Sequence, residues 1–135
     1  MRLFAALILC TAATTATATT GATEESFCLF TQECPLGDTC LEINFAMRVV
    51  VQTDRMSSDP LAPPPFLSAQ IETDAETLVG LPISSADGKT KGVFVATPNG
   101  DRHLLSFTQK GAFYSVHLPK ERLALQYSGT CEAVK

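Results

Sequence analysis

The clearest alternation of apolar and polar positions in the chain runs from Leu41 to Gln52. Its odd positions are all apolar, whereas its even positions are mostly polar; the odd ones are Leu41, Ile43, Phe45, Met47, Val49 and Val51. A period of two predicts a β-strand with one face on a core and the other in water. At about 3.4 Å per residue the run spans roughly 40 Å, so we expect this long strand to bend or bulge.

A second strand is expected just before it, over residues 26–33, joined by a turn at residues 35–39. If Cys34 faces Cys40, the antiparallel register pairs Phe27 with Met47, Leu29 with Phe45 and Thr31 with Ile43. One face of this hairpin is then consistently apolar and is predicted to face the core. On the other face, Cys28 falls opposite the small Ala46.

The second half of the chain predicts further short strands. Residues 66–72 and 77–83 are moderately apolar, with a turn or a single helical turn near Asp74 between them. Residues 91–97, 102–108, 112–118 and 122–128 follow, separated by turn sequences such as Pro98-Asn99-Gly100-Asp101. Altogether we expect an all-β fold, an antiparallel meander of about six to eight strands that closes as a small barrel or a sandwich. The proline-rich residues 54–65 are interpreted as a rigid surface loop.

The first 22 residues are not expected to belong to this domain. A basic Arg2 precedes the apolar run LFAALILC, and small residues follow up to Ala22. This is the layout of a secretory signal peptide, so residues 1–22 are assigned to the signal and its cleavage region and residues 23–135 to one β-domain. A lipid on Cys10 stays an alternative, although the bulky Leu9 before it fits a lipoprotein signal poorly.

Export changes how the five cysteines are interpreted. Signal cleavage removes Cys10 and leaves four, an even number that predicts two disulfides in an oxidising compartment. The hairpin register favours Cys34–Cys40 and Cys28–Cys131, and the second bridge ties the two ends of the domain together. Zinc held by these cysteines with His103 and His117 is the alternative, but the spacing is wider than that of a zinc knuckle.

Charge narrows the class of partner. Without residues 1–22 the chain carries nine basic and 14 acidic residues, a net charge of −5, and it contains no Lys/Arg cluster. Nucleic acid and anionic membranes both call for clustered basic residues, so neither is an expected partner. After signal removal no apolar run is long enough to be a transmembrane helix.

Candidate catalytic chemistry is sparse. The chain has no G-x-S-x-G elbow, H-E-x-x-H motif or glycine-rich phosphate loop. His103 and His117, the only histidines, fall in adjacent predicted strands and could share a sheet face as a metal or acid–base pair. Glu72, Asp74 and Glu76 lack a calcium-loop pattern and are interpreted as a solvated turn. No catalytic, metal or cofactor residue is assigned.

Two cysteine motifs carry a resemblance. The stretches FCLFTQECPLGDTC and QYSGTCE (residues 27–40 and 126–132) make the chain similar to small uncharacterised exported proteins of Gram-negative bacteria. This resemblance implies a periplasmic or secreted location and a disulfide-bonded β-domain, not an activity. Because the sequence shows no nucleophile–base pair and no metal-site spacing, we expect a non-enzymatic binding or inhibitory module that contacts an envelope protein. The alternatives are a barrel that carries a small ligand and an envelope enzyme that uses His103 and His117.

Overall fold

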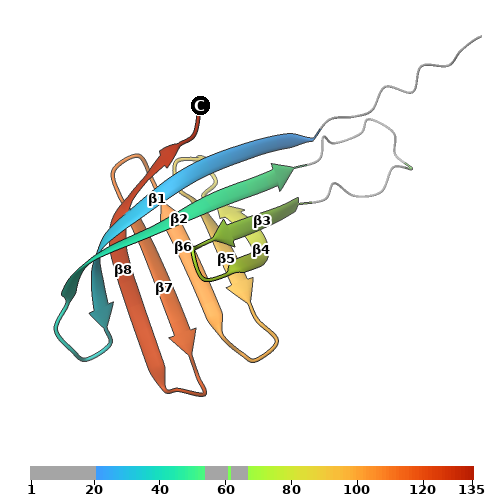
Figure 1. Cartoon of the computed structure of the whole chain (residues 1–135). Helices are drawn as coiled ribbons and strands as arrows, with labels where there is room; N and C mark the ends of the chain where they lie inside the picture. The colour runs from blue at the N-terminus through green and yellow to red at the C-terminus, as the bar shows by residue number, and fades with distance from the viewer. Residues whose placement is uncertain (1–20, 54–60, 62–66) are drawn as a thin grey trace, which may run out of the picture.

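Eight antiparallel strands close into one barrel, as Figure 1 shows for this computed structural model. The structure describes residues 21–53, 61 and 67–135, and no helix occurs among them. The strands are β1 Ala22–Pro35, β2 Leu41–Thr53, β3 Leu67–Glu72, β4 Thr77–Ser84, β5 Lys91–Ala96, β6 Arg102–Phe107, β7 Ala112–Leu118 and β8 Leu123–Ala133. Each strand pairs with the next, and β8 pairs with β1. The predicted meander is thus confirmed as a barrel rather than a sandwich.

The predicted periodicity of β2 matches the burial of its side chains. Met47 and Val49 are fully buried, and Ile43, Phe45 and Val51 pack partly buried against them. Leu41 departs from the pattern because it stands at the strand end and is 56% exposed. Val50, on the other face, is also buried. The odd face of β2 therefore forms part of the core, as predicted.

The predicted bulge is present, and it corrects the register of the first hairpin. Gln32 pairs with Glu42, as the predicted register requires, but Phe30 pairs with Phe45, so two β2 residues oppose Thr31 alone. Beyond this bulge every pair is displaced by one residue, and a shift of one reverses which face a side chain occupies. The predicted pairs of Phe27 with Met47 and Leu29 with Phe45 are therefore wrong.

The shift decides which β1 side chains form the core. Cys28 and Phe30 are fully buried, while Phe27 and Leu29 are 50% and 38% exposed on the outer wall. Cys28 accordingly lies opposite Met47 instead of Ala46, on the inner face instead of the outer one. The sequence alone could not place the bulge. A bulge changes which residues pair between the two strands, and it does not interrupt the alternation of apolar and polar residues in either strand.

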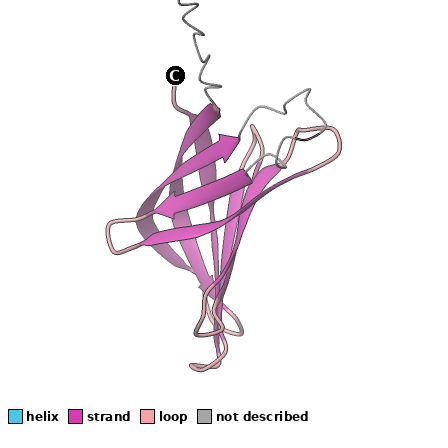
Figure 2. Cartoon of the chain, turned by 90° about the vertical axis from the view of Figure 1, so that its right-hand side faces the viewer, coloured by secondary structure: helices cyan, strands magenta, loops and turns pink. Residues whose placement is uncertain are grey.

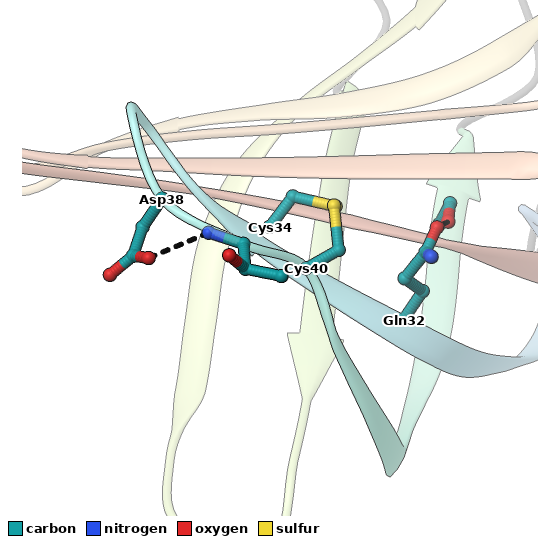
Figure 3. Close-up of a disulfide and its surroundings, with 6 residues drawn as sticks. Gln32, Cys34, Asp38 and Cys40 are labelled. Atoms are coloured by element: carbon teal, nitrogen blue, oxygen red, sulfur yellow. Dashed lines mark hydrogen bonds between the residues drawn. A yellow bond between two sulfur atoms is a disulfide. The ribbon is translucent and has the colours of Figure 1, made fainter.

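Both predicted disulfides are present. Cys28–Cys131 joins residues that are direct partners across the β1–β8 seam, where the barrel closes. Cys34–Cys40 clamps the β1–β2 turn, next to a hydrogen bond that the Thr39 backbone N–H donates to the Asp38 carboxylate at 2.7 Å (Figure 3). Two disulfides are consistent with an oxidising location outside the cytoplasm.

Glycines permit two of the sharpest features of the barrel. Gly100 adopts a φ of 102° in the β5–β6 turn, which confirms the predicted hairpin there. Gly129 on β8 lies against β1 so closely that an added Cβ would stand 2.1 Å from the Leu29 carbonyl oxygen. A side chain at residue 129 would therefore push β8 away from β1 at the seam.

The strands splay toward one end of the barrel and converge toward the other (Figure 2). The chain reaches the wider end at the start of β1, the end of β8, and the β4–β5 and β6–β7 turns (Figure 1).

Between residues 72 and 77 the connection is a tight turn rather than a helical one, closed by a 2.9 Å hydrogen bond from the Thr73 N–H to the Glu76 carbonyl. The predicted signal cleavage, Cys10 and the proline-rich loop lie outside the described residues, apart from Leu61.

Candidate ligand-binding site at the mouth of the barrel

The wider end of the barrel contains two adjoining cavities, of about 820 Å³ and about 250 Å³. They share four lining residues, Glu24, Ser26, Lys91 and Phe107. We call this combined space the mouth. Its larger part is the rim and its smaller part the throat. Their volumes lie close to the range of small-molecule sites, which runs from about 300 to 1,000 Å³.

Strand parity explains why these four side chains meet. In β1, Glu24 and Ser26 have the same parity as the buried Cys28 and so lie on the inner face. Lys91 in β5 has the parity of the buried Val93, and Phe107 in β6 that of Leu105. Each strand thus carries its core face onward into the wider end, where the side chains line a space instead of filling it.

The rim carries the charged side chains of the mouth, although the larger part of its surface is apolar. It is built by the start of β1, the end of β8 and two turns, with these further lining residues: Thr23, Glu25, Gly88, Lys89, Thr108, Gln109, Lys110, Cys131, Ala133 and Val134. A salt bridge between the Lys91 ammonium and the Glu24 carboxylate spans the rim from β5 to β1. Both side chains are at least half exposed, so this pair contributes little to stability.

The throat is mostly apolar. Its further lining residues come from β2, β3, β4 and β5: Val49, Val51, Thr53, Leu67, Pro82, Ile83, Ser84 and Gly92. Val49 is fully buried, so the throat reaches the hydrophobic core. A mainly apolar lining with a few polar or charged groups is the arrangement that most small-ligand sites share.

The narrower end contains a packed aromatic cluster instead, which we define as Phe30, Phe45, Tyr114 and Tyr127. The ring centroids of neighbouring members lie 5.4–6.3 Å apart, within the range of favourable aromatic pairs. Burial raises the pKa of Tyr127 to about 12, with the Glu33 carboxylate adding to the effect, and burial likewise raises the pKa of Tyr114.

His103 belongs to the surroundings of this aromatic cluster and not to a catalytic pair. Its Nδ1 lies 2.7 Å from the Tyr114 hydroxyl oxygen, at hydrogen-bond distance, and its ring is buried. Burial lowers the pKa of His103, against a smaller opposing effect of the Glu76 and Asp101 carboxylates. A neutral imidazole held by a tyrosine inside a barrel is a satisfied core group.

The predicted histidine pair is not brought together. His103 pairs with Val116, and the neighbouring pair is Arg102 with His117. Because adjacent residues of a strand point to opposite faces, His103 lies inside the barrel and His117 is exposed outside. The shared-face expectation is wrong: His103 has the parity of Leu105, whereas His117 has the parity of the exposed Phe113. The enzyme alternative thereby loses the two residues on which it depended.

Zinc ligation by the cysteines is also excluded, since all four are paired with each other in disulfides. Within residues 21–53, 61 and 67–135, no cluster of three or more His, Cys, Asp or Glu side chains is arranged to hold a metal ion. Glu72 bonds to Arg48, with an Nη1–Oε2 distance of 2.7 Å, rather than to its neighbours along the predicted acidic turn.

The outer wall differs between its two sides. On β1–β3, Arg48 bridges Glu25 and Glu72. On β4–β7, six apolar side chains stand 38–61% exposed and form what we call the outer patch: Val79, Leu81, Ile83, Phe94, Leu104 and Phe113. Ile83 has the outward parity of Val79 and Leu81 and, near the end of β4, also borders the throat. Direct strand pairing places Leu81 beside Phe94 and Phe94 beside Leu104, so the outer patch is continuous across three strands.

The mouth was not predicted from the sequence, although one signal pointed to it. Lys91 stands at the start of an apolar strand with the parity of Val93 and Val95, an unusual place for a lysine unless the strand end is open to water. Glu24 and Ser26 carried no such signal, because the uncorrected register assigned their parity to the outer wall. Nothing in the sequence linked Tyr114 to His103.

Searches against protein-family models, curated proteins and solved structures find no match. The part of the chain that the structure describes includes no helix with the length and hydropathy needed to cross a membrane. The fold and the mouth are therefore interpreted from their own geometry.

Proposed function

We propose that this protein is a non-enzymatic, exported binding module that holds a small, largely apolar ligand in the mouth of its barrel. The observation that carries the proposal is the apolar throat, which continues the barrel core into an open space beneath a rim that carries charged side chains. The two disulfides and the signal-like first 22 residues support a periplasmic or secreted location.

Barrel geometry supports a site of this kind. An eight-stranded barrel has an interior just wide enough to be filled by side chains or to hold one small ligand. Here the aromatic cluster fills the narrower end, and the wider end is lined mainly by smaller side chains such as Ser26, Val49 and Val51. Ligand binding therefore requires no rearrangement of the packed core.

The test uses N-phenyl-1-naphthylamine, a neutral dye whose fluorescence rises in apolar surroundings. We expect the folded protein to bind it with one saturable site. Ser26→Phe places an aromatic ring where rim and throat meet, and we expect it to weaken dye binding at least tenfold. Asn44→Phe introduces the same ring at an exposed position on the outer wall of β2 and serves as the matched control.

Three results are informative. Loss of binding in Ser26→Phe with retention in Asn44→Phe places the dye in the mouth. Equal binding by both variants and the parent would place the dye elsewhere and overturn the proposal. Absence of any saturable binding by the parent would overturn it as well. Circular dichroism of each variant establishes that the barrel is folded.

Protein contact is a second candidate function, and the outer patch favours it. Contiguous exposed apolar side chains on a small exported domain are typical of protein-binding surfaces. Its partner would be an envelope protein that presents a complementary apolar surface. The measurement is affinity capture with the parent, Leu81→Ser/Phe94→Ser and Ser26→Phe in parallel. A partner lost only with the double variant supports this function, and a partner retained by all three contradicts it.

A further inference from the structure

We infer that the ligand of the mouth is an anionic amphiphile, with a single carboxylate- or phosphate-like head group at the rim and a hydrocarbon tail in the throat. This inference rests on the proposed function and adds the chemical class of the ligand. It follows from the charged side chains on the rim, the hydrogen bonds that already engage some of them, and the apolar side chains that line the throat.

The rim is locally basic on an acidic chain. Three lysines line it, Lys89, Lys91 and Lys110, against two glutamates, Glu24 and Glu25. The whole chain, by contrast, has a net charge of −4. Lys89 and Lys91 lie at the β4–β5 turn and the start of β5, and Lys110 lies in the β6–β7 turn, so the rim carries lysines from two neighbouring connections.

The two glutamates are already engaged. Both carboxylate oxygens of Glu25 accept hydrogen bonds from Arg48, at 2.8 and 3.3 Å, on the outer side of β1. Glu24 accepts one from Lys91. Neither carboxylate is therefore available to a cationic ligand without breaking an existing ion pair.

The remaining lysines are better placed to receive an anion. Among the described residues Lys110 makes no ion pair, and the Lys89 contact with Asp87 is long, at 3.8 Å, between two exposed side chains. An ammonium that donates to a ligand carboxylate or phosphate forms a charge-assisted hydrogen bond, about twice as strong as a neutral one. An anionic head group thus gains contacts that a neutral or cationic one does not.

The apolar side chains of the throat are suited to a hydrocarbon tail. Val49, Val51, Leu67 and Pro82 line it, and Phe107 lies where it joins the rim. Each methylene buried there is expected to strengthen binding about fourfold, which corresponds to the usual transfer free energy of about 0.8 kcal/mol per methylene. Affinity should therefore climb with chain length and level off where the tail reaches the packed core.

The experiment compares three ligands with the same ten-carbon tail: decanoate, decan-1-ol and decyltrimethylammonium. Each is titrated against protein that is preloaded with N-phenyl-1-naphthylamine, in low salt and below its micelle concentration. We expect decanoate to displace the dye at a concentration about tenfold lower than the other two. Added salt should narrow that difference, because ions screen exposed charges beyond about 10 Å at 0.1 M.

Two lysine variants test the head-group contacts. Lys110→Gln should cancel most of the preference for decanoate over the other two ligands. Lys91→Gln should reverse that preference, so that decanoate binds more weakly than the cationic ligand, because it leaves the Glu24 carboxylate unpaired at the rim. Lys120→Gln removes the same charge from the β7–β8 turn at the opposite end of the barrel and should change nothing.

The outcomes distinguish the head group from the site itself. Displacement by all three ligands at equal concentrations would overturn the anionic head group and leave the proposed function standing. The inference of an anionic head group is also overturned if Lys120→Gln lowers the preference for decanoate as much as Lys110→Gln does. The effect would then arise from the net charge of the protein alone. Failure of every ligand to displace the dye would overturn the proposed function.

Discussion

The two ends of this barrel are built from the same eight strands and differ in how their interior is filled. At the narrower end, Phe30, Phe45, Tyr114 and Tyr127 meet ring to ring, and their volume fills the interior. At the wider end β1 and β2 supply Ser26 and Val51, which together with Lys91 of β5 line a cavity of about 250 Å³ below a larger one. Side-chain size along a continuous inner face therefore decides where a small barrel has a packed core and where it has a cavity.

The two ends of the barrel also differ in the interactions that stabilise them. Aromatic packing stabilises the narrower end, whereas near the mouth the Cys28–Cys131 disulfide fastens β1 to β8 with Cys131 itself in the rim. A covalent link does this without occupying the space that a ligand would need. The following predictions, from the largest effect to the smallest, test how far this contrast holds.

Removing the seam disulfide should have the largest effect. Cys28 and Cys131 are 103 residues apart in the chain, and Cys34 and Cys40 only six. In the chain-entropy model, replacing the first pair by alanine costs about 4.7 kcal/mol and replacing the second about 2.4 kcal/mol. Urea denaturation of both double variants beside the parent measures the difference. Equal losses would mean that the seam is held by packing instead.

Truncating a side chain of the aromatic cluster should lower the free energy of unfolding by nearly as much. Phe30→Ala removes a fully buried ring in contact with three others, with an expected loss of about 3 to 5 kcal/mol. Phe107→Ala, at the half-buried mouth, should cost clearly less, because its ring already borders open space. Thermal unfolding compares them. A larger loss for Phe107→Ala would identify the mouth as a core region.

The Tyr114–His103 hydrogen bond should have an intermediate effect. Tyr114→Phe keeps the ring and leaves His103 Nδ1 without that partner, which should cost about 1 to 3 kcal/mol. The same substitution at Tyr127 removes a hydroxyl that lies closer to solvent and should cost less. Urea denaturation at pH 8 measures both. An unchanged midpoint for Tyr114→Phe would show that the hydroxyl contributes nothing.

The lowered pKa of His103 predicts a pH dependence of stability. Because burial disfavours the charged imidazole, the unfolded chain binds the proton more readily, and the free energy of unfolding should fall as pH drops below about 6.5. His103→Gln should remove this part of the slope, whereas His117→Gln, a change at an exposed position, should keep it. The free energy of unfolding between pH 8 and 5 tests both. Identical slopes in both variants would contradict the assignment.

The smallest effect is expected on the outer wall. Phe45→Ala, on the inner face of β2, should cost about 3 kcal/mol or more. Asn44→Ala, one residue away on the exposed face, should cost under about 0.5 kcal/mol. Thermal unfolding of the pair shows whether the inner and outer faces are as distinct as the burial of β2 indicates. A greater loss for Asn44→Ala would mean that the bulge at this position is itself a stabilising feature.

Much of the fold could be predicted from the sequence because strand periodicity and turn residues are local signals. β7, over Ala112–Leu118, agrees with its predicted range at both ends, and both disulfides have the predicted partners. The inner face of β1 could not be predicted, since it depends on where the bulge at Thr31 interrupts the pairing. Both faces of β1 carry apolar residues, so its own pattern did not decide between them.

The mouth was beyond prediction for a different reason. Its lining residues lie on most strands of the barrel, and they meet only because the strands splay at one end (Figure 2). His103 illustrates the same limit. Asp101 lies only two residues before it in the chain, but Glu76 acts on it from the β3–β4 turn, and only the folded barrel brings that turn near it.

Thr23 and Val134, close to the two ends of the domain, both line the rim. Anything attached to either end of the domain, whether a lipid, an affinity tag or a fused protein, is therefore tethered beside the entrance instead of at the far pole. A bulky fused protein would obstruct access to the mouth, and a lipid would hold the mouth close to a bilayer. Insertion of a tag in the β7–β8 turn avoids both effects and leaves the entrance facing free solution.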